Sequence, residues 1–306
     1  MYNICAISTI SHQDSFRNTN LFSDIVVLDS KTELIAPNYK ELISSGQLRR
    51  LSPILRMGLA AAIDCQNQVN SEFDSLVIGT ALGCLKDTEK FLVTFNTSTG
   101  DFLPPTSFIQ STHNTIGGQI SLHLKNRSYN MTHTQNNLSF EVSLLDAMMC
   151  IDEGKSNVLV GAADEKIPFL EEIRPELITS EYPLSSCASF FVLSHNLGKS
   201  RIGINLVGIN FNVKNIDNEI MMFLEFNEIG IDELDLILHS DSSLNIVSDH
   251  SNALNYLDYS GMNYSASAFA THLAHDYLNH NDGRNVLIIN NLCEGKLGLI
   301  IISKTQ

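Results

Sequence analysis

The stretch SFEVSLLDAMMCIDEGKSNVLVGAADE, residues 139–165, contains a segment with helical periodicity followed by a short apolar run. Residues 139–153 are predicted to form a helix and residues 157–161 a strand. Short apolar runs and stretches with helical periodicity alternate along the rest of the chain, which is the pattern of an α/β fold. Several runs contain Val, Ile and Leu without polar alternation, which predicts strands that are covered on both faces.

The same criteria predict the other elements of the chain. The expected strands cover residues 4–8, 75–80, 129–132, 188–194, 203–209, 235–239, 285–290 and 297–303. The expected helices cover residues 48–67, 87–94, 107–124, 219–227 and 265–279. Residues 167–186, which contain Pro168, Pro175 and Pro183, are the best candidate for a connector. We therefore expect one unit, residues 1–306, built from two related halves at 1–170 and 180–306.

The composition indicates a large core and a shared surface. The chain has 306 residues, of which 43% are hydrophobic and only 17% are charged. A typical domain has roughly 25% charged residues, so this deficit predicts an oligomer interface. The formal net charge of −15 argues against general binding to nucleic acid or to an anionic membrane.

The sequence also bears on the compartment. No segment has the roughly 20 apolar residues of a membrane-spanning helix, and the N-terminus does not resemble a signal peptide. The six cysteines are scattered, without a CxxC pair, as expected for reduced thiols. We therefore expect a cytoplasmic protein without a membrane span.

Three segments that precede residues 139–165 resemble, together with these residues, a known protein family. They are YKELISSGQLRRLSPILRMGLAAAI (39–63), VIGTALGCLKDTEKFL (77–92) and PTSFIQSTHNTIGGQISLHLKNRSYNMT (105–132). In this order, the four blocks resemble the N-terminal half of elongating β-ketoacyl-acyl carrier protein synthases. The Ser-Phe-Glu and Leu-Leu-Asp-Ala steps are most similar to ketosynthase-like proteins of aryl-polyene, flexirubin and related polyketide clusters.

The resemblance implies a thiolase-like fold, with two similar βαβ-rich halves in an αβαβα layered arrangement. ASFFVLSHN (188–196) resembles the strand that opens the second half. DLILHSDSSLNIVSDHSNAL (235–254) and SGMNYSASAFATHLAHDYL (260–278) resemble degraded copies of the two histidine motifs of the family. NVLIINNLCEGKLGLIIIS (285–303) resembles its final strand pair without the glycine-rich turn.

Condensation in this family requires a cysteine at a helix N-terminus, where the helix dipole favours the thiolate. The family pattern places this nucleophile on Asn137, or on Asn136 or Gln135 if the alignment shifts by one or two residues. None of these residues is a cysteine. Cys150 falls in the last turns of the same helix, about 20 Å from its start, and we expect it to be a small buried core residue.

The two catalytic histidines that the resemblance implies are not both present. His239 follows an expected strand at the position of the first histidine, with Ser240 in place of the glycine of the motif and Asp241 nearby. The second histidine would fall near Ala266 or Ser267. We therefore expect His239, Ser240 and Ser267 to line a remnant pocket that does not support condensation.

Other kinds of site have weaker support. His272, His275 and Asp276 share a helix surface, which we expect to be solvated rather than to bind zinc. Cys293 replaces a glycine of the family's turn, and we expect a packed thiol there. GxGxxG after a strand and GxSxG are both absent from the sequence. We expect neither a cofactor nor a metal.

Two classes of function remain open. The first is a catalytically inactive subunit of the chain-length-factor type, which pairs with an active β-ketoacyl-acyl carrier protein synthase in polyketide, aryl-polyene or fatty-acid-like biosynthesis. The second is an acyl-transferring or decarboxylating homologue, which Gln135 keeps open because some relatives with glutamine in place of the cysteine are thought to decarboxylate malonyl groups. A homodimeric protein that binds acyl chains is a third, weaker reading.

The resemblance further implies a dimer that pairs the strand at 129–132 across a two-fold axis, either as a heterodimer with a ketosynthase or as a homodimer. Acyl carrier proteins are acidic and dock on basic patches, so a chain with a net charge of −15 repels them on average. Arg49, Arg50 and Arg56 form the basic cluster that we consider for such a contact, with local ion pairs as the alternative. We expect carrier docking to fall mainly to the partner subunit.

Overall fold

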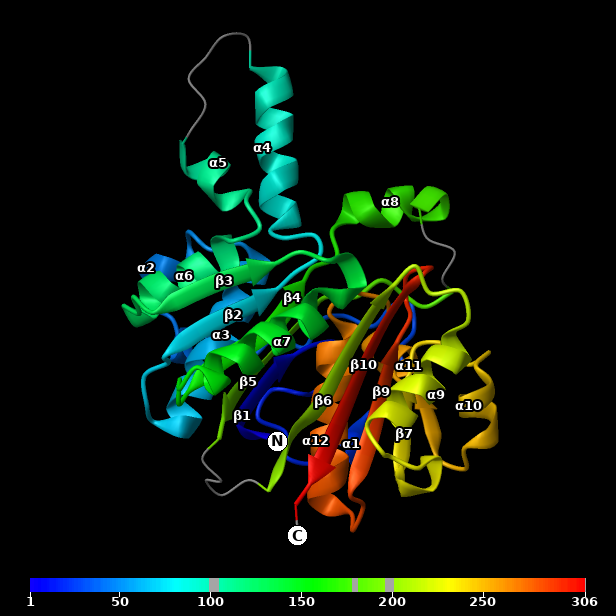
Figure 1. Ribbon diagram of the computed structural model, residues 1–306. Coiled ribbons are helices and arrows are strands. Elements are labelled where there is room, and N and C mark those ends of the chain that lie inside the picture. The colour runs from blue at the N-terminus through cyan, green and yellow to red at the C-terminus, as the bar shows by residue number, and fades with distance from the viewer. Residues whose placement is uncertain (99–104, 178–180, 196–200, 306) are drawn as a thin grey trace.

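The computed structural model describes residues 1–98, 105–177, 181–195 and 201–305 (Figure 1). The strands are β1 Tyr2–Ile10, β2 Ser75–Gly79, β3 Tyr129–His133, β4 Val158–Asp164, β5 Cys187–Ser194, β6 Ile202–Phe211, β7 Leu236–His239, β8 Ala253–Asn255, β9 Asn285–Asn290 and β10 Lys296–Lys304. The helices are α1 Leu21–Asp24, α2 Ser45–Leu48, α3 Pro53–Val69, α4 Leu85–Thr97, α5 Pro105–Gln110, α6 Thr115–Leu124, α7 Ser139–Asp152, α8 Pro168–Leu177, α9 Ile216–Phe226, α10 Asn245–Asp249, α11 Leu257–Ser260 and α12 Ala266–His280. Short 3-10 turns lie at η1 Tyr39–Glu41, η2 Asn136–Leu138 and η3 Ile231–Glu233.

The described strands form a sheet in which one strand order occurs twice. The order is β3-β2-β4-β5-β1-β6-β10-β9-β7-β8. From the centre outward, both sets of five strands run first, fifth, fourth, second and third in chain order. The two sets pair only where Tyr2 faces Ile204 and Asn3 faces Gly203, so they diverge beyond these residues.

One strand lies in a different place from the one we expected. We expected residues 188–194 to open the second half, but β5 lies between β4 and β1 and is antiparallel to both. A continuous apolar run is compatible with any central position, so the sequence does not specify its neighbours. The division at 1–170 and 180–306 stays a prediction, and the change between the two five-stranded sets falls between β5 and β6.

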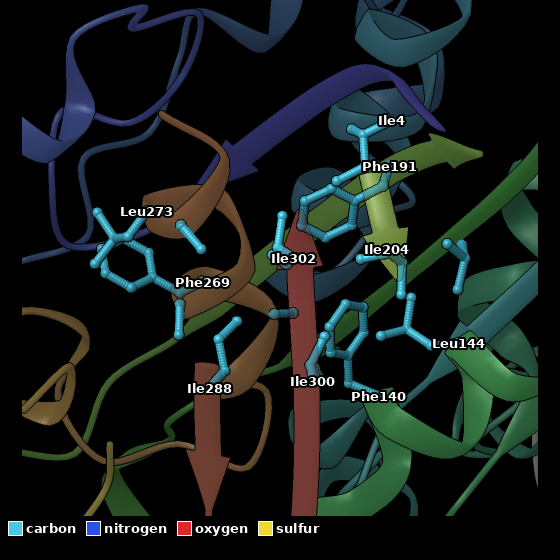
Figure 2. Packing of buried hydrophobic residues seen from close by; sticks show 14 of the residues in the cluster. Ile4, Phe140, Leu144, Phe191, Ile204, Phe269, Leu273, Ile288, Ile300 and Ile302 are labelled. Carbon is cyan, nitrogen blue, oxygen red and sulfur yellow. The ribbon is translucent and has the colours of Figure 1, made fainter. Parts of the chain in front are cut away.

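The buried side chains show the layers. One cluster joins α7 and α12 to strands of both sets, including Phe140, Phe191, Phe269 and Ile300 (Figure 2). A second cluster joins α3 and α6 to β1, β2, β4 and β5, and a third joins α9 and α10 to the second set. This is the expected αβαβα arrangement, with α7 and α12 in the central layer.

Residues 139–165 form the helix and the strand that were predicted for them. In α7, Phe140, Leu144, Ala147 and Ile151 are buried at helical spacing. All residues of β4 are buried, because β2 and β5 flank the strand and helices cover both of its faces. This combination places the start of α7 inside the molecule, between the two sets of strands.

Some predicted boundaries differ from the structure. The helix expected at 48–67 begins instead at Pro53, a residue that favours the first turn of a helix, and α2 is separate. The helix expected at 107–124 is divided into α5 and α6. The expected connector contains α8, which also begins at a proline, and the three-residue strand β8 was not predicted.

Two surface features bear on assembly. The helices α4 and α5 project from the body of the molecule, at the top of Figure 1, and contact each other through Phe91 and Phe108, whose ring centroids are 5.6 Å apart. Strand β3 lies at one edge of the sheet. Within the described residues, none of the helices combines the length and the apolar character required to cross a membrane.

Candidate functional site

The candidate site begins at the turn between β3 and α7. Ser139 holds this turn: its hydroxyl accepts a hydrogen bond from the Gln135 N–H (2.9 Å) and donates one to the Asn136 carbonyl (2.7 Å). Asn136 has a φ of 53°, in the left-handed region that asparagine tolerates. Gln135 and Asn136 are exposed, whereas Asn137 is fully buried. Of the three candidates for the nucleophile position, only Asn137 therefore lies inside the protein.

Asn137 is bound to the end of β9. Its side-chain Nδ2 donates to Asn290 Oδ1 (3.2 Å), and Asn290 Nδ2 donates to the Asn137 carbonyl (2.7 Å). Asn290 Nδ2 also donates to Glu141 Oε1 (2.7 Å). These bonds connect the first turns of α7 to the second set of strands, so the two asparagines act as a buried cross-link.

Glu141, one turn into α7, is a fully buried carboxyl group that our sequence analysis did not single out. Burial raises its pKa from 4.5 to about 7, and the hydrogen bond from Asn290 offsets part of this rise. Ser267, at the start of α12, lies near Glu141 and also offsets part of the rise in the pKa of Glu141. The Ser267 hydroxyl itself has no hydrogen-bond partner among the described residues. A Cβ on Gly298 would lie 2.9 Å from Glu141 Oε1, so β10 packs directly against this carboxyl group.

His239 lies at the end of β7 and is buried. Burial lowers its pKa, and the charge and backbone of Asp241 offset part of this effect, so the environment favours the neutral ring. Ser240 is bound to Asn291, since its Oγ donates to Asn291 Oδ1 (2.8 Å) and accepts from the Asn291 N–H (3.0 Å). The structure brings α12 into contact with α7, β7 and β9, while the remnant pocket formed by His239, Ser240 and Ser267 stays a prediction.

These groups form a closed cluster. Asn137, Glu141, Ser267 and Asn290 are each no more than 2% exposed. Within the described residues, four of the cluster's polar atoms have no hydrogen-bond partner: Asn137 Oδ1, Glu141 Oε2, His239 Nδ1 and Ser267 Oγ. The site therefore contains amides fixed by hydrogen bonds, a carboxyl group of raised pKa and an imidazole of lowered pKa.

Comparisons with known proteins agree with this geometry. The sequence model for the N-terminal domain of β-ketoacyl synthases matches residues 31–194, more than half of the chain. The chain belongs to the β-ketoacyl synthase family. No curated protein matches the sequence at a significant level.

Solved structures extend the ketosynthase likeness to the whole fold. A structure of the ishigamide ketosynthase/chain length factor has a TM-score of 0.79 and 13% identity, and the match covers 100% of this chain and 99% of that one. The type II polyketide ketosynthase AntDE in complex with its acyl-carrier protein AntF gives 0.80 and 14%, over 99% of both chains. The ketosynthase ApeO in complex with its chain length factor ApeC, from Xenorhabdus doucetiae, gives 0.76 and 12%, over 99% of this chain and 98% of that one. At these identities the likeness establishes the thiolase-like ketosynthase fold.

The two cysteines considered above lie in different settings. Cys150 is buried near the end of α7, as expected, and burial raises its pKa. Cys293 follows β9 and is half-buried. Burial raises the pKa of Cys293, while a hydrogen bond with the backbone of Asn137 partly offsets this rise. Cys293 thus lies next to the turn at which we expect the nucleophile position from the sequence, and its environment favours the thiol over the thiolate.

The expectation that His272, His275 and Asp276 form a solvated face of α12 is wrong. His272 and Asp276 are buried, and His275 is only partly exposed. His272 Nδ1 lies 3.0 Å from Thr9 Oγ1, and Asp276 Oδ2 accepts a hydrogen bond from the Phe22 N–H (2.8 Å). His272 and Asp276 are largely covered because α12 lies in the central layer, which helical periodicity alone does not reveal.

The structure divides the basic cluster. Arg56 donates from Nε to the Leu51 carbonyl (2.9 Å) and from a terminal nitrogen to the Leu48 carbonyl (2.8 Å), so its guanidinium group stabilises the turn between α2 and α3. Arg49 and Arg50 are exposed. Among the described residues, none of the three forms a local ion pair. Only Arg49 and Arg50 remain as candidates for contact with a carrier protein.

Proposed function

We propose that this chain is a non-condensing ketosynthase-like subunit, of the chain-length-factor type, that pairs with an active β-ketoacyl synthase in polyketide-type biosynthesis. The observation that carries the proposal is the buried amide of Asn137 at the start of α7. A neutral amide does not accept and release an acyl group as a thiolate does. Here the amide is also engaged with Asn290, so it serves a structural role.

The surrounding cluster supports the same conclusion. Ser267 stands near the position of the second histidine, and a serine does not supply the imidazole that polarises a thioester carbonyl. Asn137, Glu141, Ser267 and Asn290 are almost fully buried, and hydrogen bonds join Asn290 to Asn137 and Glu141, which supports a filled site. A filled site favours a scaffold, whereas an enzyme would need a tunnel that reaches the reacting atoms.

The edge strand β3 supports pairing with another chain. Its outer side has no neighbouring strand among the described residues, and such an edge is available to a second chain. Tyr129 and Met131 are 41% and 39% exposed. Tyr129 and His133, on the same face of the strand, bind Asp146 of α7. The strand therefore offers a partner an unpaired edge together with the exposed side chains of Tyr129 and Met131.

The projecting helices add exposed apolar surface. On α4, Leu92, Val93 and Phe95 are more than half exposed, as are Phe108 and Ile109 on α5. Exposed apolar patches of this kind commonly mark sites of interaction with other proteins. We propose that the partner is an active synthase, or a second copy of the chain when the synthase is absent, and that docking of an acyl carrier protein falls mainly to the synthase.

Co-purification with candidate ketosynthases from the same genome tests this proposal. We expect a stable complex with one synthase and a change in the length of its product when this chain is present. Met131→Lys should weaken the complex at least about tenfold, because a charge is buried without a partner. Met222→Lys on α9, where the methionine is 55% exposed, is the matched control and should have no effect. Failure to bind any synthase, or equal effects of both substitutions, would contradict the proposal.

A second function is supported by one observation, the contact between Cys293 and the backbone of Asn137. If this thiol accepted an acyl group, the chain would be an acyl-transferring or decarboxylating homologue with a rearranged site. Intact-protein mass spectrometry after incubation with acyl carrier protein thioester separates the two functions. An adduct mapped to Cys293 would favour the enzyme.

A further inference from the structure

A cavity of about 690 Å³ lies away from the remnant active site. It opens where β1 and β6 diverge, and β1, α3, the last turns of α12, the start of β6 and the end of β10 line it. It shares none of its lining residues with the cluster around Asn137 and Ser267. Its size is in the range of small-molecule sites, about 300–1,000 Å³.

One wall of the cavity is apolar. Ile4, Ala6 and Ile7 of β1 and Ile202 of β6 line it. Gln68 closes the exposed edge of β1 at Ile7, since its Oε1 accepts from the Ile7 N–H (3.2 Å) and its Nε2 donates to the Ile7 carbonyl (2.7 Å). This bidentate cap takes the place of a neighbouring strand, so the wall suits the body of a small molecule better than an added strand.

The polar lining contains three cations. Arg17, Arg201 and Lys304 line the cavity of a chain whose net charge is −15. The two carboxylates of the lining already have partners: Asp64 accepts from Arg17 Nε (2.6 Å) and Gln68 Nε2 (3.0 Å), and Asp276 accepts from the Phe22 N–H. Within the described residues, neither Arg201 nor Lys304 has a carboxylate within 4.0 Å. The lining is therefore locally positive.

Arg17 is held in place for such a role. The residue has a φ of 59°, an uncommon conformation for a side chain of this size. Its Nε is fixed by Asp64, which is buried, while the side chain is 49% exposed. In the described part of the chain its terminal nitrogens make no hydrogen bond. An arginine oriented by a buried carboxylate keeps planar donors free for a carboxylate or phosphate group.

The histidines of the lining are uncharged. Burial lowers the pKa of His272 to about 3 and that of His275 to about 4. His272 is fixed by Thr9, and His275 keeps part of its surface toward the cavity. Neutral imidazoles provide hydrogen-bonding groups without adding charge, so the arginines and Lys304 set the sign of the preferred ligand.

We propose that this cavity binds a small organic anion, whose carboxylate or phosphate head contacts Arg17 and Arg201 and whose apolar body lies on Ile4 and Ile7. The site does not depend on the function proposed for the Asn137 cluster. It lies beside β1, the strand of the first set that adjoins the second set, whereas the proposed subunit interface is at the edge strand β3.

Cys5 provides a direct readout, because it lines the cavity and is one of two half-buried cysteines. Cys293 is the other and serves as an internal control, while the remaining four cysteines are buried. The full-length protein is treated with a thiol-alkylating reagent, alone or with hexanoate, hexyl phosphate or hexanol. Modification of each cysteine is followed by peptide mass spectrometry.

We expect hexanoate, hexyl phosphate or both to slow alkylation of Cys5 about tenfold at concentrations about tenfold above Kd, with Cys293 unchanged. The two anions distinguish a carboxylate site from a phosphate site. Arg201→Gln should raise the Kd about tenfold or more, since it removes a charge-assisted contact. Arg49→Gln, the same change at an exposed arginine outside the cavity, should leave the Kd unchanged.

Four results would overturn the proposal. They are the absence of Cys5 protection by either anion, equal protection by hexanol, an equal effect on Cys293, and equal effects of Arg201→Gln and Arg49→Gln. Arg201 is the chosen position because Arg17→Gln would leave the buried Asp64 without its cation and destabilise the fold.

Discussion

Glutamine in place of Glu141 removes a titrating group from the centre of the protein while keeping nearly the same shape. The folded state raises the pKa of this carboxyl group from 4.5 to about 7, because the group is fully buried. One pKa unit corresponds to about 1.4 kcal/mol, so the shift corresponds to about 3 kcal/mol. The protonated form is the one that the fold accommodates.

The sign of the effect follows from proton binding. Between pH 4.5 and 7 the folded protein keeps a proton on Glu141 that the unfolded chain has released. The free energy of unfolding therefore contains a contribution from Glu141 that is fully present below pH 4.5 and is lost as the pH rises through 7. Glu141→Gln lacks this contribution and should show a correspondingly shallower decline over the same range.

Urea unfolding from pH 4.5 to 8 measures this difference. The stability of Glu141→Gln relative to the native sequence should rise by about 3 kcal/mol across the range and then level off. Glu225→Gln, at an exposed position on α9, controls for the removal of a negative charge. Glu165, whose pKa burial also raises to about 7, contributes equally to both proteins and cancels. A difference that does not change with pH would refute a protonated, buried Glu141.

Three further predictions concern the same cluster. The isolated chain should form no stoichiometric acyl adduct with acyl carrier protein thioesters in intact-mass measurements, and an adduct on Cys150 or Cys293 would contradict this. Asn137→Ala should lower the unfolding free energy by about 1–3 kcal/mol, because it leaves Asn290 Oδ1 without its close donor; unchanged urea unfolding would count against the cross-link. Gly298→Ala should cost about 1–3 kcal/mol through its overlap with Glu141, and a double mutant with Glu141→Ala should remove most of that cost. Gly118→Ala, where a Cβ meets nothing within 4 Å, is the control, and an equal loss there would exclude the overlap as the cause.

Local pattern was sufficient for much of the fold. The apolar periodicity of residues 139–153 predicted α7, and the continuous apolar runs predicted β2, β4, β5, β9 and β10, because a covered strand needs no polar alternation. The sequence did not predict which strands pair with one another. Residues 188–194 were expected to open the second half, but β5 pairs with β1 and β4, because pairing depends on residues far apart in the sequence.

The sequence likewise predicted some features of the candidate site and not others. The lack of a cysteine at 135–137 and of a histidine at 266–267 is visible in the sequence, because it depends on residue identity alone. Glu141 passed unnoticed because a glutamate in the first turn of a helix is ordinarily an exposed residue that complements the dipole. In the structure, Glu141 packs against Gly298 of the apolar strand β10. This contact joins segments far apart in the sequence, so the sequence alone did not reveal that Glu141 is buried.

The sequence by itself determined the family, the layered α/β fold and the absence of a cysteine at 135–137, since these depend on local periodicity and on which residues are present. Only the tertiary structure decided that Asn137, Glu141 and Asn290 form one buried cluster, that His272 of α12 is buried, and that Arg17, Arg201 and Lys304 line one cavity. The physical reason is that burial and proximity arise from contacts between distant segments. These contacts set the pKa values, the hydrogen-bond partners and the local charge on which function depends.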